Sequence, residues 1–125
     1  MAYMLDLKTF TDERGRLTPI DGILPFDIVR LYYIDEISNH ADRGGHLHFK
    51  TVEAIFCVYG SFDVIINNGK TKVEYHLNDR RQCLVVEPLD WHKIHNFSAG
   101  AILMGVSSTH YDHSDYQQEE PVLLP

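Results

Sequence analysis

The sequence has little of what marks several large classes of protein. Only two cysteines, Cys57 and Cys83, occur in 125 residues, too few for a disulfide framework and typical of buried structural thiols. The 11 Lys and Arg are outnumbered by 18 Asp and Glu, for a formal charge of -7, and a phosphate backbone selects clustered cations instead. No apolar run approaches the ~20 residues of a membrane span, and the first residues lack a signal-peptide pattern. We therefore expect a cytoplasmic protein with no nucleic-acid or membrane partner.

A sustained apolar repeat of 3.6 residues is also missing, which predicts little helix. Short runs rich in branched and aromatic residues recur instead at strand-like spacing, at 27–34, 53–60, 61–69, 71–77, 82–88, 91–98 and 101–108. An Asn-Gly turn signal within 67–70 marks a hairpin. The pattern favours an all-β fold in one domain over residues 1–125, and a jelly roll is the double-sheet form that can enclose a ligand. The tail from residue 110 onward is not assigned by pattern.

The segment RGGHLHFK at 43–50 places His46 and His48 one residue apart. In an extended strand such side chains point to the same face of the sheet. The pair can therefore bind a metal ion together or divide the work of a proton transfer. Histidine's ordinary pKa of ~6.5 suits it to remove a proton next to a carbonyl group near neutral pH.

Two segments resemble the sequence motifs of the cupin superfamily. The first holds His46, His48 and Glu53, and the second holds His92 after Pro88, with a shorter gap than usual and Asp in place of the usual Gly. In metal-binding cupins the matching histidines and glutamate ligate a divalent ion, and imidazole with carboxylate suits Fe, Mn, Ni or Zn. A metal-dependent cupin enzyme is thus one hypothesis.

A longer sequence match favours a second hypothesis. The segments DERGRLTPID, LPFDIVRLYYI, RGGHLHFK, WHKIHNFS and YDHSDY resemble, in the same order, those of the sugar-nucleotide 3,4-ketoisomerases, small cupins that act on dTDP-4-keto-6-deoxyglucose. The resemblance implies a cupin jelly roll without metal or other cofactor, in which His46 and His48 move a proton between C3 and C4 through an enediol, in deoxysugar biosynthesis. Where the family is expected to have Gln after the glutamate, this chain has Ala54. That difference could alter a hydrogen bond in the cleft, and it keeps a non-catalytic sugar-binding cupin as a third hypothesis.

The enediolate in such a reaction carries negative charge on oxygen, and donors aimed at it lower the barrier. Tyr33 and Arg43 are the candidate donors. Strand alternation is expected to turn Tyr33 toward the histidine pair and Tyr32 to the opposite face, unless a bulge reverses the parity. We expect replacement of His48 to abolish turnover and replacement of His46 to impair it severely, while the division into base and acid stays open.

The nucleotide half of this substrate needs cations for its diphosphate and a flat group for its base. Arg14 and Arg30 are the predicted diphosphate ligands, because the planar guanidinium binds phosphate with two parallel hydrogen bonds. Lys50, Trp91 and His92 complete this set of candidate substrate-binding residues. The Trp91 ring could cover the thymine, and the alternative is a core Trp beside a buried neutral histidine.

Two further expectations concern the product and the assembly. His95 is a candidate substrate-binding residue and proton donor on the opposite wall of the cleft, which favours the galacto product, although in a regular strand it is out of phase with His92. Edge strands and the apolar segment at 3–7 predict a homodimer. The resemblance adds that strands are exchanged between its subunits.

Overall fold

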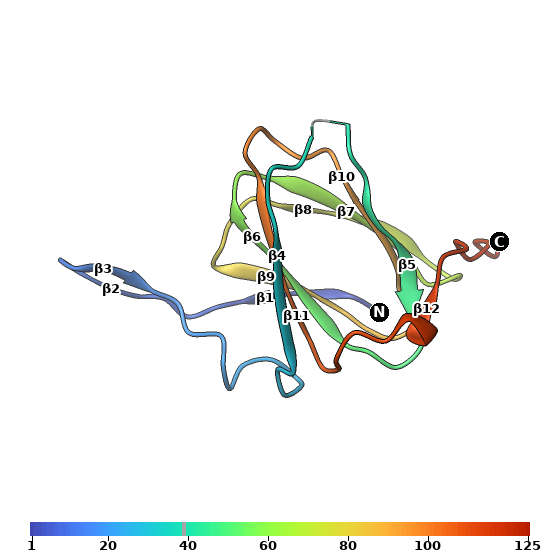
Figure 1. Ribbon diagram of the computed structural model, residues 1–125, viewed down its shortest axis with the longest axis horizontal. Coiled ribbons are helices and arrows are strands. Elements are labelled where there is room, and N and C mark those ends of the chain that lie inside the picture. The colour runs from blue at the N-terminus through green and yellow to red at the C-terminus, as the bar shows by residue number, and fades with distance from the viewer. Residues whose placement is uncertain (39) are drawn as a thin grey trace.

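The computed structural model describes residues 1–38 and 40–125, which form a sandwich of two antiparallel five-stranded sheets (Figure 1). The first sheet contains, in spatial order, β1 (Tyr3–Asp6), β9 (Gln82–Val86), β6 (Glu53–Tyr59), β11 (Ile102–Ser107) and β4 (Arg30–Ile34). The second contains β12 (Tyr116–Gln117), β5 (Arg43–His48), β10 (Trp91–His95), β7 (Phe62–Asn67) and β8 (Lys72–Leu77). The predicted all-β sandwich is confirmed.

Helix is limited, in the described residues, to one 3-10 turn, η1 (His113–Asp115), just before β12. The tail that the sequence pattern left unassigned therefore returns to the body and adds an edge strand to the second sheet. No helix in the described part of the chain is long and apolar enough to cross a membrane.

The apolar core lies between the sheets, and a second apolar cluster covers the outer face of the first sheet. Strand β6 contributes to both, because Ile55 and Cys57 face the core while Ala54 and Phe56 belong to the outer cluster. A strand buried on both faces has a continuous apolar sequence, which explains the run at 54–57. The chain before β4 covers the outer cluster through partly buried side chains of Ile20, Leu24 and Phe26.

Both cysteines are buried and unpaired, as the sequence predicts. Burial raises the pKa of the Cys57 thiol to about 11, and burial likewise raises the pKa of the Cys83 thiol to about 11. A thiol with so high a pKa holds almost no thiolate at neutral pH and is a poor nucleophile.

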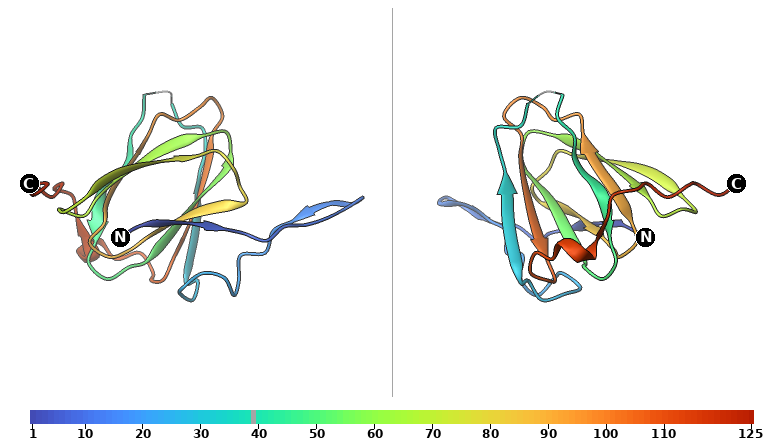
Figure 2. Two further views of the ribbon diagram at one scale, coloured as in Figure 1. Left: turned by 180° about the vertical axis from the view of Figure 1, so that it is seen from behind. Right: turned by 45° about the vertical axis from the view of Figure 1, so that its right-hand side comes forward.

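A two-stranded arm leaves the body of the molecule. Strands β2 (Phe10–Asp12) and β3 (Gly15–Leu17) pair only with each other and project from one end of the sandwich (Figures 1 and 2). All six residues are exposed, including Phe10 and Leu17, whose exposed fractions are 51% and 64%. An isolated hairpin of this kind is only marginally stable in water.

Candidate active site

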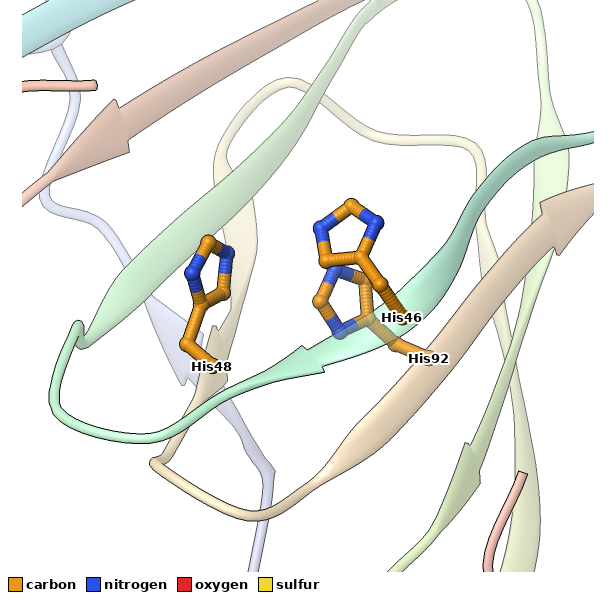
Figure 3. A group of neighbouring side chains, drawn as sticks. All are labelled: His46, His48 and His92. Atoms are coloured by element: carbon orange, nitrogen blue, oxygen red, sulfur yellow. The ribbon is translucent and has the colours of Figure 1, made fainter. Parts of the chain in front are cut away.

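Three histidines gather on the inner face of the second sheet. His46 and His48 lie on β5, and His92 lies directly opposite His46 on the neighbouring β10 (Figure 3). The ring of His46 has its centroid 4.7 Å from that of His92 and 5.0 Å from that of His48. The predicted same-face arrangement of the histidine pair is thus present, and the cupin-like His92 joins it.

The backbone of β5 is irregular where it pairs with β10. Gly44 and Gly45 have φ values of 75° and 76°, a conformation that favours glycine, and a Cβ at Gly44 would come within 3.0 Å of the His92 carbonyl oxygen. The pairing of β5 with β10 shifts register beside His92. The extra residue at this shift lies on β5, whereas β10 pairs with β7 without a shift. Regular alternation therefore turns His92 and Ile94 to the interior, while His95 points to the other face and hydrogen-bonds Glu74 of β8 at 2.9 Å.

His48 lies between two carboxylates. Its Nδ1 is 3.3 Å from Oδ2 of Asp115, a contact in which the ring nitrogen can donate a hydrogen bond to the carboxylate. Its Nε2 is buried and lies 3.3 Å from Oε2 of Glu53 without the geometry of a hydrogen bond.

Tyr32, and not Tyr33, reaches this group. The Tyr32 hydroxyl donates a hydrogen bond to Oε1 of Glu53, whereas the Tyr33 side chain is 68% exposed at the rim of the site. The predicted alternation is therefore reversed, since Tyr32 faces Glu53, although Tyr33 still lies at the edge of the cavity lining. Strand β4 pairs with β11 without a bulge, and Arg30, Tyr32 and Ile34 are its more buried residues.

The environment sets the charge of these groups. Burial, together with the neighbouring His92 and His48, lowers the pKa of His46 to about 4, and burial also lowers the pKa of His92. Burial alone would raise the pKa of Glu53, but His48, His92 and Tyr32 overcome it and lower the pKa. At neutral pH the site therefore holds neutral imidazole at His46 and His92 beside an ionised Glu53.

A cavity of about 300 Å³ opens onto the histidines between the two sheets. Its lining combines cationic, phenolic and imidazole groups with a few apolar side chains: Arg30, Tyr32, Tyr33, Ile34, Arg43, Gly44, His46, Glu53, His92, Ile94, Leu103 and Tyr116. His48 lies behind this layer and is 5% exposed. Among the histidine pair, His46 is thus the one with direct access to a bound molecule.

Tyr116 of β12 forms the part of the cavity lining that comes from the carboxyl-terminal end of the chain. Its ring centroid is 4.5 Å from that of His46 and 4.5 Å from that of His48. Sequence reasoning missed Tyr116, Tyr32 and Asp115. The segment YDHSDY was a signal for two of them, because it lies in the matched set although no strand pattern marks it.

The predicted substrate-binding residues separate into two groups. Arg30, Arg43 and His92 line the cavity. The structure does not bring the other candidates there within one chain: they are Arg14, Lys50, Trp91 and His95. Their positions have separate physical causes.

The arginine and the lysine are exposed at a distance from the cavity lining. Arg14 lies at the tip of the arm and pairs with Asp12 through a 2.6 Å contact. Lys50 follows β5, where its ammonium group is 3.7 Å from Asp112.

Trp91 and His95 lie on β10 but do not face the cavity. Trp91 is buried and donates from Nε1 to the Gln118 carbonyl oxygen at 3.0 Å, so the core alternative holds for this residue. His95 is held on the outer side by Glu74. The predicted proton donor on the opposite wall was therefore misplaced, and with it goes the reason for favouring a galacto product.

Ala54 does not remove a hydrogen bond from the cleft. Glu53 faces the cavity, so the alternation of β6 turns the next residue to the outer face, where Ala54 is fully buried among Phe56, Val85 and Val106. The expectation that Ala54 changes the cleft was wrong.

The three histidines also form a possible metal-binding group. One ring nitrogen from each of His46, His48 and His92 can lie within 4.8 Å of the others, and three imidazoles suit several divalent metals. The carboxylate that would complete a cupin metal site, Glu53, already accepts the Tyr32 hydroxyl.

Comparisons with known proteins identify the family of this chain. A family model described as "FdtA: WxcM-like, C-terminal" matches residues 2–121. The TDP-4-oxo-6-deoxy-α-D-glucose 3,4-oxoisomerase of Aneurinibacillus thermoaerophilus is 35% identical over 115 residues, which are 90% of this chain and 83% of that protein.

Solved structures of ketoisomerases have the same fold. The QdtA sugar 3,4-ketoisomerase of Thermoanaerobacterium thermosaccharolyticum, in complex with TDP, is 32% identical with a TM-score of 0.90, covering 94% of this chain and 88% of that one. The WlaRB TDP-quinovose 3,4-ketoisomerase of Campylobacter jejuni gives 32% and 0.90, with 94% and 92% covered. The predicted cupin jelly roll is confirmed, and the chain belongs to the WxcM-like (FdtA) family and is a sugar-nucleotide 3,4-ketoisomerase.

Proposed function

We propose that this protein converts TDP-4-keto-6-deoxyglucose into the corresponding 3-keto sugar, for deoxysugar biosynthesis. Two observations on relatives support this substrate: the name of the Aneurinibacillus enzyme, and a QdtA variant with one histidine replaced, which was solved in complex with TDP-4-keto-6-deoxyglucose. The observation that carries the proposal is the meeting of His46, Tyr32 and two arginines in one cavity. Together they supply a base, a hydroxyl donor and cations for an anionic substrate.

In the proposed mechanism, neutral His46 removes the proton from C3 while Tyr32 donates a proton to the C4 oxygen, which gives the 3,4-enediol. The C3 hydroxyl then gives its proton to the Tyr32 oxygen, and the protonated His46 ring, whose proton exchanges with solvent, gives a proton to C4. The carbonyl group thus moves from C4 to C3 with no net change in atoms or electrons, and both side chains regain their starting state. Arg30 and Arg43 stabilise negative charge on the substrate. His48, behind the cavity lining, supports this proton transfer in place of acting directly on the sugar.

The experiment that tests this function is incubation with TDP-4-keto-6-deoxyglucose in deuterated water, followed by NMR. We expect a 3-keto product with solvent deuterium at C4. Binding of the nucleotide sugar without turnover would instead support the non-catalytic sugar-binding cupin.

The lowered pKa of His46 predicts an unusual acid limit for the reaction. A base must be unprotonated, and with a pKa of about 4 the His46 ring stays unprotonated well below neutral pH. The value of kcat/KM reports the free enzyme. We expect it to be constant from pH 8 to near 5 and to fall only below that, measured by initial rates, with circular dichroism to verify folding. A half-maximal value at pH 6 to 7 would contradict His46 as the base.

Metal removal separates the proposed mechanism from a metal-dependent cupin. Acid-base chemistry at His46 and Tyr32 needs no ion, so we expect full activity after prolonged dialysis against a chelator. Activity that disappears and returns with one divalent metal would favour an ion held by the three histidines.

We also propose a homodimer with exchanged arms, which explains why Phe10 and Leu17 are exposed on a hairpin whose two strands pair only with each other. Strand β1 pairs with β9 of its own chain, so the arm and not segment 3–7 is the element to exchange. A groove of about 460 Å³ lies beside the arm. Its lining includes Leu7, Ile20 and Phe56, which give the arm of a partner subunit an apolar surface to pack against. Exchange would also carry Arg14 to the partner subunit.

The dimer is tested by light scattering at micromolar concentration. We expect twice the mass of the chain, and a Phe10→Asp variant is expected to shift the population toward monomer, because burying a carboxylate at the interface is unfavourable. A monomeric wild-type protein would contradict the proposal.

A further inference from the structure

We propose that Asp115, in the turn before the last strand, is a positioning residue of this enzyme that holds His48 with its proton on Nδ1. The inference deepens the proposed ketoisomerase function and rests on it. It concerns a carboxylate that neither contacts the cavity nor belongs to the histidine motif.

Asp115 has the environment of a fixed, ionised group. It is 4% exposed, and the 3-10 turn that carries it begins with Asp112 as N-cap. Its Oδ1 accepts the Lys50 backbone N–H at 2.9 Å, and its Oδ2 accepts the Thr51 hydroxyl and faces His48. Both oxygens thus accept hydrogen bonds, which fix the orientation of the carboxylate plane beside the His48 ring.

The consequence falls on the other nitrogen of His48. With the proton on Nδ1, the Nε2 lone pair points into the buried space beside Glu53, whose other oxygen holds the Tyr32 hydroxyl. Asp115, His48, Glu53 and Tyr32 thus form one chain of contacts that ends at the cavity. A proton that passes inward from the cavity through Glu53 can be taken up by His48, and returned along the same path, only if Nε2 has a free lone pair, which the Nδ1 tautomer provides.

An Asp115→Asn variant reverses this arrangement with little change in shape. The Lys50 N–H keeps the amide oxygen at the Oδ1 position, which places the NH₂ group opposite His48 Nδ1. An amide NH₂ donates, so the ring must accept at Nδ1 and carry its proton on Nε2. Thr51 can then donate to Thr109, whose hydroxyl is 2.7 Å away.

We expect Asp115→Asn to lower kcat by ~10²-fold or more, as a wrong imidazole tautomer does in other enzymes, with the dissociation constant for TDP changed less than twofold. The matched control is Asp112→Asn, in the same turn, where the amide oxygen can still cap Ser114. This control is expected to retain wild-type kcat.

Two measurements distinguish positioning from a general structural role. In a His48→Asn background, Asp115→Asn is expected to cause no further loss of kcat, because its effect acts through the ring. Nitrogen-15 NMR of the histidine side chains is expected to show protonated Nδ1 at His48 in the wild type and protonated Nε2 in Asp115→Asn. An unprotonated Nδ1 in the wild type overturns the inference whether or not any variant folds, as does an additive loss in the double variant. Absence of turnover by the wild-type enzyme would count against the proposed function instead, and the NMR result would still decide the position of the proton.

Discussion

Replacing His46 with Asn is expected to reduce kcat by ~10²- to 10⁴-fold, the usual range for the loss of a general base. His46 lines the cavity, and its lowered pKa leaves it neutral and able to accept a proton. A base acts in the transition state and contributes little to ground-state binding. The affinity for TDP, measured by calorimetry, is therefore expected to stay within a few-fold of the wild type.

The matched control for this variant is His76→Asn. His76 lies on the exposed face of β8, 2.5 Å from Asp63, and outside the cavity lining, so it is expected to retain full activity. A His46→Asn enzyme whose kcat is within threefold of the wild-type value would contradict the assignment of His46 as the base. If His48→Asn were then the inactive variant, the buried histidine would be the group that removes the C3 proton.

Tyr32→Phe is expected to lower kcat by ~10²- to 10³-fold, comparable to the loss of one donor to a developing oxyanion. The change removes the hydroxyl without removing the ring, and burial beside Glu53 raises the pKa of Tyr32 so that the hydroxyl keeps its proton. The variant also leaves one oxygen of the buried Glu53 without its donor, which is expected to cost about 1–3 kcal/mol of folding free energy. Initial rates and thermal unfolding measure the two effects separately.

Tyr33→Phe makes the same chemical change one residue further along β4. Its side chain is 68% exposed, and we expect kcat and unfolding temperature close to those of the wild type. Equal losses in the two variants would contradict the assignment of Tyr32 as the donor, and a loss confined to Tyr33→Phe would restore the original reading of the strand.

The fold could be predicted largely from local patterns. Alternating and continuous apolar runs located most strands, and the Asn-Gly signal at 67–70 marks the turn between β7 and β8. The arm and the final strand were beyond this reasoning. The residues of β2 and β3 are all exposed, so no alternation of apolar and polar residues marks them as strands. Strand β12 has only two residues, and its extended conformation depends on its pairing with β5, which its own sequence does not reveal.

The site was predicted as far as one strand can determine it. His46 and His48 share a face because of their spacing, and Arg30 and Arg43 reach the cavity. The phase of Tyr32 and Tyr33 was predicted wrongly because the inward face of β4 is set by its partner β11, which the sequence of β4 alone does not contain. Asp115 was not predicted for a related reason: it lies 67 residues from His48 in the sequence, and only folding brings the two side chains together.

The docking of the carboxyl-terminal turn also has a consequence for motion. Strand β12 is a two-residue edge strand, and short edges are where proteins open first without unfolding globally. Each such opening would release His48 from Asp115 while both sheets stay intact. The backbone N–H groups of Phe49 and Lys50, which bind the carbonyl and carboxylate oxygens of Asp115, should then exchange with deuterium faster than those of β7. Their exchange rates measure how much of the time the enzyme spends in a folded but inactive form.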